Sequence, residues 1–157
     1  MGGVRVPAEA AGRTHRFELR GNWSGDLGRG SIGLGGAQAV AISVPATFGG
    51  TGPGTNPEEL LLASALSCYM MTLARVLDGR GLRGVAVEAT IVGEVTRTKG
   101  GLHFDRIRLR PRVATEGMGE DDRQRVATAL RDAEEACFIA QTLRPVIPYV
   151  LEPAGSD

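Results

Sequence analysis

The feature that most constrains the fold of this chain is an uncharged run from Leu60 to Ala74. Its residues are apolar or small on nearly every side of a helix, whereas a helix at a protein surface shows a single apolar stripe. The sequence therefore predicts a helix that other structure encloses. The run is shorter than a membrane span and contains Ser and Thr, so we interpret it as a core helix and expect no membrane partner.

Signals for both ends of this helix flank the run. Asn56 can cap the N-terminus, Pro57 suits the first helical position, and Glu59 lies where a capping box needs a carboxylate. Gly79 can take the left-handed conformation that ends a helix. We therefore predict a helix over 57–78, which would be about 33 Å long.

Length and charge limit the classes of partner. A chain of 157 residues fits one domain, which we assign to 1–157. Basic and acidic residues number 18 each, and this balance argues against a nucleic acid partner held by bulk charge. The N-terminal residues lack the apolar segment of a secretory signal, so we expect a cytoplasmic protein. Two cysteines and two histidines cannot supply a four-ligand zinc spacing, so we expect no zinc site of this kind.

Two regions are typical of β-structure. Residues 14–23 and 37–44 flank a glycine-rich stretch and predict a small antiparallel meander. Strict alternation of apolar and polar residues from Val85 to Val92 predicts a half-buried strand. Residues 98–102 then predict a hairpin with a three-residue loop.

One register makes both faces of this hairpin consistent. Thr98 would face Leu102, Glu94 would face Arg106, and Ile91 would face Leu109, together with the pairs Glu88–Arg112, Thr90–Arg110 and Val87–Val113. The arginines at 106, 108, 110 and 112 could form a phosphate-binding stripe. Because they meet glutamates across the hairpin, we interpret them as a solvated, charge-paired face.

The C-terminal third predicts a second helix and a last strand. The helix runs from Gly119 to Cys137 with an acidic start, and its apolar spacing turns Cys137 inward. Residues 146–151 predict an edge strand after Pro145. The chain is thus predicted to be an α+β protein with antiparallel sheet packed on a long helix.

One glycine motif is discarded as a cofactor site. Gly28, Gly30 and Gly33 match G-x-G-x-x-G, but a dinucleotide site needs a helix directly after this motif. Strand-like residues follow instead.

The two cysteines, each on a helix turned toward the interior, are the sharpest chemical feature. A buried Cys is usually a small apolar residue, and either one alone would be more often core than catalyst. The spacing of Cys68 and Cys137 does not show whether they meet.

Three segments closely resemble those of the OsmC/Ohr family. Gly54-Thr55-Asn56-Pro57-Glu58-Glu59-Leu60, with Cys68 ten positions after Glu58, resembles the family's G-T-N-P-E-[EQ]-L…C segment. Trp23-Ser24-Gly25-Asp26-Leu27-Gly28-Arg29-Gly30 resembles its W-x-G-D-x-x-R-G segment, and Glu134-Glu135-Ala136-Cys137 is a third match. The resemblance implies antiparallel sheets wrapped around a long central helix, in an intertwined homodimer.

The resemblance also implies an activity, namely a thiol peroxidase of the antioxidant stress response that reduces organic hydroperoxides without metal, flavin or haem. Cys68 would be the peroxidatic thiolate and Cys137 the resolving thiol. Arg29 and Glu58 would be the polar pair that orients the peroxide and activates the sulfur. A dithiol, such as a lipoyl group, is the reductant that the resemblance suggests.

The chemistry of the residues agrees with these roles. Cys68 lies too far into its helix for the dipole to stabilise a thiolate, so a cation such as Arg29 has to do so. The sulfenic acid formed by peroxide would over-oxidise unless it condensed with Cys137 to a disulfide. A carboxylate such as Glu58, which could also be an ordinary acid of the first helical turn, would hold the guanidinium plane.

Geometry favours a site shared between two chains. On one unbroken helix Glu58 and Cys68 are about 15 Å apart along the axis, beyond the reach of both side chains. We therefore expect Glu58, with Arg29, to come from a second subunit, so that two sites form at the interface of a symmetric dimer.

The chain departs from the resemblance at one place, and this leaves alternatives open. Phe138-Ile139-Ala140 follows Cys137, where the best-known members have proline and then a serine two positions on. This difference bears on the geometry of the resolving step and on the reductant. The alternative function is a stress-associated protein that binds a small molecule in the same apolar pocket without turning over peroxide; a third is a structural role with two inert thiols.

Overall fold

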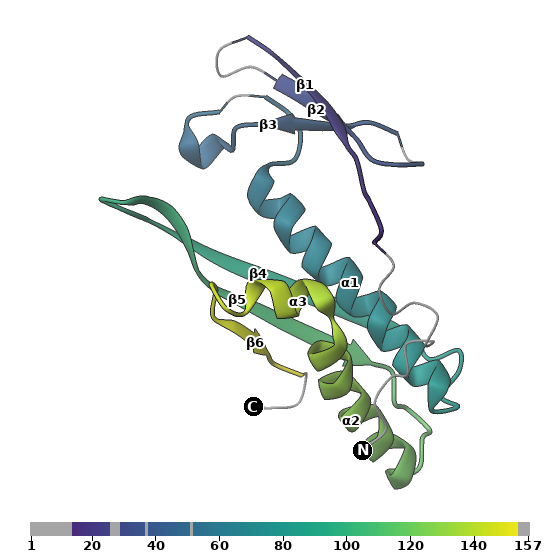
Figure 1. Cartoon of the computed structure of the whole chain (residues 1–157). Coiled ribbons are helices and arrows are strands. Elements are labelled where there is room, and N and C mark those ends of the chain that lie inside the picture. Colours follow the sequence, from purple (N-terminus) through teal and green to yellow (C-terminus); the bar gives the residue numbers. More distant parts are fainter. Residues whose placement is uncertain (1–13, 26–28, 37, 51, 154–157) are drawn as a thin grey trace. The chain divides into compact units, whose positions relative to one another are not determined.

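The structure is a computed structural model, and it describes residues 14–25, 29–36, 38–50 and 52–153. The chain forms two compact units, residues 1–60 and 61–157. The long helix α1, Pro57–Gly79, begins in the first unit and continues through the second (Figure 1). The assignment of one domain to 1–157 stays a prediction.

The first unit is built on a small antiparallel sheet in the order β1-β2-β3. Its strands are β1 (Arg20–Ser24), β2 (Arg29–Gly33) and β3 (Val40–Ser43), and a 3-10 helix, η2 (Ala46–Phe48), follows. The predicted meander is confirmed. The first strand is shorter than the pattern suggested, because residues 14–19 make no sheet pairing.

The N-terminus of α1 is capped largely as predicted. The side-chain oxygen of Asn56 accepts a hydrogen bond from the backbone N–H of Glu59 at 2.9 Å. In a capping box the Glu59 carboxylate would accept a hydrogen bond from the backbone N–H of Asn56. Here it accepts one from the Thr55 hydroxyl instead, at 2.7 Å. The predicted end was also wrong, since the helix includes Gly79 and the left-handed conformation occurs at Gly81, with φ of 73°.

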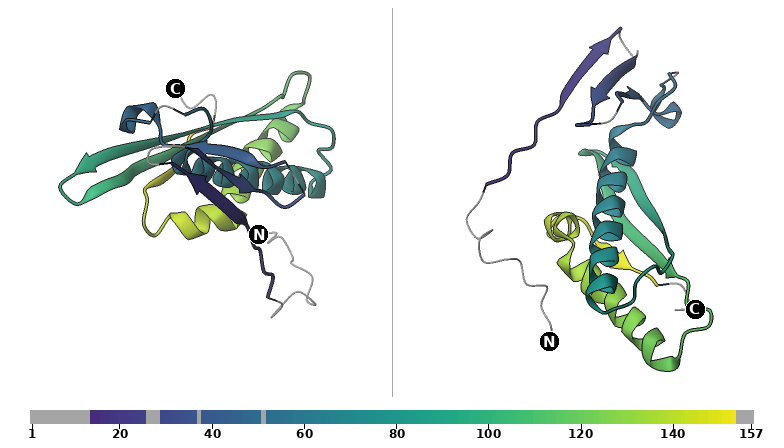
Figure 2. Two further views of the ribbon diagram at one scale, coloured as in Figure 1. Left: turned by 90° about the horizontal axis from the view of Figure 1, so that it is seen from above. Right: turned by 90° about the vertical axis from the view of Figure 1, so that its right-hand side faces the viewer.

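The second unit contains a three-stranded sheet in the order β4-β5-β6. A long hairpin joins β4 (Val87–Thr98) to β5 (Gly101–Val113), and the short β6 (Tyr149–Leu151) lies at the edge, parallel to β5 (Figure 2). The predicted edge strand is confirmed in its C-terminal half.

The hairpin register matches the prediction over most of its length. Glu94 pairs with Arg106, and the pairs nearer the open end follow as predicted, from Thr90–Arg110 to Val87–Val113. At the turn the prediction was wrong, because Thr98 pairs with Gly101 and the loop has two residues. A bulge between Glu94 and Val95 shifts the register by one.

The interpretation of the arginine face is confirmed in part, since two of its four arginines form ion pairs with residues that the structure describes. Arg108 forms an ion pair with Glu94, and Arg110 pairs with Glu152 at 2.7 Å. The first pair is diagonal, because Arg108 lies two residues along β5 from Arg106, the residue directly opposite Glu94.

Two helices complete the second unit. α2 (Glu120–Ala136) and α3 (Phe138–Leu143) are separated by Cys137 alone, which has extended backbone angles, φ −69° and ψ 107°. The prediction that α2 includes Cys137 was wrong, because the helix ends one residue earlier, at Ala136. Cys137 is nevertheless inward, with no exposed surface.

One face of the sheet carries the core. Leu109 of β5 is fully buried, and it lies in a cluster with side chains of α1, α2 and α3. The helix residues of this cluster are Tyr69, Leu73, Val76, Leu77, Val126, Ala129, Leu130, Ala133 and Ala140. The helices therefore cover the sheet on one side, and the two cysteines belong to this layer.

Much of α1 is not enclosed within the single chain, contrary to the expectation from its composition. By length and composition the helix could cross a membrane, as the core helix of a soluble protein also could, yet only 28% of its most apolar window is buried. An uncharged exposed stripe runs along it, formed by Ala63, Ser67, Met71 and Ala74. Met71 is 73% exposed.

Candidate functional site

The two thiols meet in the second unit. Cys68 lies in the middle of α1 and is half-buried, whereas Cys137 at the junction of α2 and α3 is fully buried; both are free thiols. Cys68 packs against the core cluster that contains Cys137, close enough to raise the pKa of the Cys137 thiol. The sequence did not show whether Cys68 and Cys137 lie close together, and the structure places them in one core cluster. Cys68 is partly accessible to solvent, whereas Cys137 is buried.

The environment of Cys137 keeps its proton in place. Burial raises the pKa of the Cys137 thiol from its ordinary value near 9 to about 11, and contact with Cys68 adds to the increase. The backbone amides of Ala140 and Ile139, in the first turn of α3, lower the pKa of Cys137 and so offset part of this increase. At neutral pH Cys137 is thus a thiol that must lose a proton before it can act as a nucleophile.

A polar cluster that sequence reasoning missed lies beside Cys137. Glu134 of α2 is 15% exposed and forms an ion pair at 2.6 Å with Arg144, which directly follows α3. The charges of Glu134, Arg144 and both cysteines all act on the phenol of Tyr149 on β6. Glu134 carried a sequence signal through its motif, but Tyr149 and Arg144 had none, because only the tertiary packing brings β6 to this place.

The first unit holds the other two predicted site residues. Arg29 opens β2, and its side chain is exposed. Its position depends on Gly30, whose partner across the sheet is Trp23. A Cβ on Gly30 would lie 2.7 Å from the indole ring and 2.4 Å from the Asn22 carbonyl oxygen, so only glycine lets the ring lie over this strand.

A short chain of contacts connects Arg29 to the start of α1. Arg29 pairs with Ser43 of β3, and the Ser43 N–H donates to the Thr55 carbonyl at 2.9 Å. Thr55 in turn donates its N–H to the Ala41 carbonyl at 2.9 Å. The helix N-terminus that carries Glu58 is thereby fixed to the sheet that carries Arg29.

Glu58 has an unusual environment for a helix's first turn. Its Oε2 is buried and accepts no hydrogen bond from any residue that the structure describes. Among the residues that the structure describes, Glu58 and Arg29 do not form an ion pair with each other. A buried carboxylate oxygen without a donor is costly, and it marks a position where a partner group is expected.

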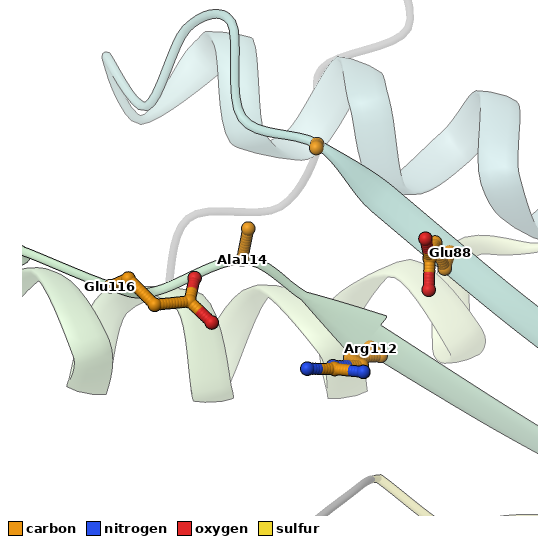
Figure 3. Close-up of a pocket in the computed structure, with 5 residues that line it drawn as sticks. Glu88, Arg112, Ala114 and Glu116 are labelled. Carbon is orange, nitrogen blue, oxygen red and sulfur yellow. The ribbon is translucent and has the colours of Figure 1, made fainter.

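Two surface hollows are weaker candidates. One of about 160 Å³ lies at the open end of the hairpin, where Glu88 of β4 and Arg112 of β5 lie near Ala114 and Glu116 (Figure 3). Its side chains are exposed and it contains no thiol. The other, of about 520 Å³, lies beside α2.

The hollow beside α2 is lined by groups that already have partners. Arg80 is paired with Asp132, and Arg125 with Asp122 at 2.6 Å. Across the ranges that the structure describes, no three His, Cys, Asp or Glu side chains gather in a metal-binding arrangement.

Comparison with known proteins gives the family. Residues 50–152 match the family described as OsmC-like protein. The uncharacterized protein YmaD of Bacillus subtilis is 33% identical over 141 residues, 88% of this chain and 93% of the relative. Peroxiredoxin OsmC of Escherichia coli is 26% identical over 129 residues, 80% of this chain and 88% of that protein.

Solved structures share the α+β fold. An OsmC-like protein of unknown function from Vibrio cholerae superposes with a TM-score of 0.73 at 17% identity, over 89% of this chain and 99% of that one. An organic hydroperoxide resistance protein OsmC from Legionella pneumophila gives 0.69 at 18% identity, over 89% and 98%. At these identities the likeness establishes the fold alone. Together with the match over residues 50–152, it shows that the chain belongs to the OsmC-like protein family.

Proposed function

We propose that this protein is a cysteine-based peroxidase that reduces organic hydroperoxides to alcohols. The observation that carries the proposal is the contact between a half-buried Cys68 and a fully buried Cys137. The names of relatives support it, since one is a peroxiredoxin and another an organic hydroperoxide resistance protein. A partly accessible thiol backed by a protected one is the arrangement that a two-cysteine peroxidase needs.

The reaction would proceed in two steps. The Cys68 thiolate attacks the peroxide, the O–O bond breaks, the alkoxide takes a proton to become the alcohol, and Cys68 is left as a sulfenic acid. Cys137 then attacks the Cys68 sulfur, so that the S–S bond forms and the S–O bond breaks. The departing hydroxide takes the Cys137 proton and leaves as water. An external dithiol, such as a lipoyl group, returns both thiols to the reduced state in the cytoplasm.

Arg29 and Glu58 serve the first step in this proposal. The guanidinium supplies positive charge for the Cys68 thiolate and binds the peroxide oxygens, and the Glu58 carboxylate fixes its orientation. The buried Oε2 of Glu58, which lacks a donor, supports this role because an arginine would satisfy it. The chain's two cysteines and this polar pair would then form one site.

We further propose that the polar pair and the thiols of one site come from different subunits of a homodimer. Glu58 and Cys68 lie ten residues apart on the single helix α1, about 15 Å along its axis. The uncharged exposed stripe of α1 supports the dimer, because an apolar surface of this kind is normally covered.

The first experiment mixes reduced protein rapidly with cumene hydroperoxide or with hydrogen peroxide and follows the intact mass. We expect a stoichiometric loss of two hydrogens, faster with the organic peroxide and absent in Cys68→Ser. Thiols that stay reduced, or that oxidise only over hours, would contradict the peroxidase and favour a protein that binds a small ligand.

A complementation experiment tests the shared site. Glu58→Ala and Cys68→Ser are each expected to be inactive, but a heterodimer of the two contains one site with both Cys68 and Glu58 intact if these come from different chains. Mixing and re-associating the variants should therefore restore activity. If both residues come from the same chain, every site stays defective and no activity returns.

A further inference from the structure

The hydroxyl of Tyr149 is buried and has no hydrogen-bond partner among the residues that the structure describes. Buried hydroxyls without a partner are uncommon in folded proteins, and each calls for a reason. The other tyrosine of the chain, Tyr69, shows the ordinary arrangement, since its hydroxyl donates to the Leu130 carbonyl at 3.2 Å. Tyr149 is therefore the exception within one core.

The backbone fixes Tyr149 firmly. It lies on β6 opposite Ile107 of β5, and the Ile107 N–H donates to the carbonyl of the preceding Pro148 at 2.9 Å. Its side chain packs against the core cluster that contains Cys137, and Cys68 packs against the same cluster. A strand rather than a loop thus holds Tyr149 in the part of the core that contains the two thiols.

The surrounding groups keep this hydroxyl protonated. Burial, first, and the negative charges of Cys137 and Glu134 raise the pKa of Tyr149 well above its ordinary value, and Cys68 adds to this. Arg144 acts in the opposite direction with a smaller effect than Glu134. Tyr149 can therefore donate a hydrogen bond at any physiological pH but cannot serve as a base.

Cys137 needs such a donor. Its sulfur must become anionic to attack, although burial raises the pKa of its thiol to about 11. A negative charge that develops in a buried site is stabilised by a hydrogen-bond donor held in the same part of the core. An unpartnered hydroxyl and a sulfur that becomes charged thus lie in the same part of the core.

We propose that the Tyr149 hydroxyl donates a hydrogen bond to the Cys137 sulfur while that sulfur attacks the oxidised Cys68. Tyr149 is then a catalytic residue of the resolving step only. It keeps its own proton throughout, and the proton of Cys137 leaves with the departing hydroxide as water. The inference rests on the peroxidase function proposed above.

The test uses Tyr149→Phe, which removes only the hydroxyl. Because this hydroxyl has no partner in the reduced protein, the variant should fold with unchanged or higher stability. After rapid mixing with cumene hydroperoxide, the consumption of one equivalent of peroxide should keep the wild-type rate. Disulfide formation should slow by about tenfold or more, the usual effect of losing a hydrogen bond to a charged group. The sulfenic acid should accumulate and be trapped by dimedone.

Tyr69→Phe is the matched control. It also removes one buried phenolic hydroxyl, but that hydroxyl is already bonded to the Leu130 carbonyl. We expect it to leave the rate of disulfide formation unchanged. Equal slowing in both variants, or wild-type disulfide formation in Tyr149→Phe, would overturn the proposal.

A second oxidant separates this inference from the peroxidase function. Diamide adds to an accessible thiolate without any peroxide, and the second thiol then displaces the hydrazine, which takes the released proton, as the S–N bond breaks and the S–S bond forms. If wild-type protein ignores peroxide but forms the disulfide with diamide, the peroxidase fails while the role of Tyr149 is still measured. Slower disulfide formation in Tyr149→Phe, but not in Tyr69→Phe, supports the role; equal rates refute it.

Discussion

Glu58 and Glu59 are neighbours in the first turn of α1 with opposite environments. Glu59 is exposed, and its carboxylate accepts the Thr55 hydroxyl at 2.7 Å. Glu58 has a buried Oε2 that accepts nothing from the described residues. The Glu59 carboxylate therefore has a hydrogen-bond donor within the chain, whereas the buried oxygen of Glu58 has none among the described residues.

Glu58→Gln should slow the oxidation of Cys68 by organic hydroperoxide by about tenfold or more, equivalent to about 1.4 kcal/mol of transition-state free energy. The amide cannot hold a guanidinium by a charge-assisted bidentate contact. Stopped-flow measurement of the first turnover reports this step. Glu59→Gln is the control and should react at the wild-type rate; equal loss in both variants would contradict the assignment of Glu58.

Met71→Glu should convert the proposed dimer to a monomer. Met71 is 73% exposed on the uncharged stripe of α1, and a carboxylate there would have to be buried in the proposed interface. Sedimentation velocity gives the mass of the species in solution. Ala127→Glu, at an exposed position on α2, should leave the proposed dimer intact. A wild-type protein that is monomeric and fully active would refute the shared site.

Gly93→Ala should destabilise the fold by about 1–3 kcal/mol, the usual cost of overpacking a core. A Cβ at Gly93 would lie 2.7 Å from the Phe104 ring and 3.0 Å from a methyl group of Leu62, so the hairpin would be pushed away from α1. Urea unfolding measures the loss. Gly79→Ala, which meets nothing within 4 Å, should be neutral or slightly stabilising.

The free energy of unfolding should decrease at alkaline pH, and the decrease should begin at a lower pH than the ionisation of the tyrosines. The pKa of Cys137 is raised to about 11 in the folded chain, so the unfolded chain releases this proton first. The free energy of unfolding is therefore unaffected well below pH 9 and decreases by roughly 2–3 kcal/mol as the pH rises to about 11. Tyr69 and Tyr149, whose pKa values burial also raises, add their own decrease from about pH 10.

Urea unfolding at closely spaced pH values measures this slope. In Cys137→Ala the decrease between about pH 9 and 10 should disappear, while the later decrease from the tyrosines remains. An identical slope in both proteins would show that Cys137 does not carry the effect.

Local signals predicted the elements that short-range chemistry determines. Asn56 caps α1 because its side chain bonds the N–H of Glu59, and this contact is visible in four consecutive residues. The hairpin register followed from alternation, since a slip of one residue would expose the apolar face. The bulge beside Glu94 left no such signal, so the pairing of Thr98 was predicted one residue away from its place.

The candidate site was predictable only in part for the same reason. Cys68 and Cys137 could be placed on inward faces from spacing, and their contact required the packing of α1 against the α2–α3 junction. The orphaned oxygens of Glu58 and Tyr149 could not be foreseen, because whether a polar atom finds a partner depends on every side chain around it.

The break between α2 and α3 makes Cys137 a pivot. A disulfide requires two sulfurs to approach to about 2 Å. A cysteine inside a continuous helix could move only by unwinding a turn, with several backbone bonds lost. Cys137 has extended backbone angles, and its carbonyl holds one α3 amide, that of Gln141, at 3.0 Å. In the proposed peroxidase, Cys137 could therefore move toward Cys68 and back while both flanking helices keep their shape.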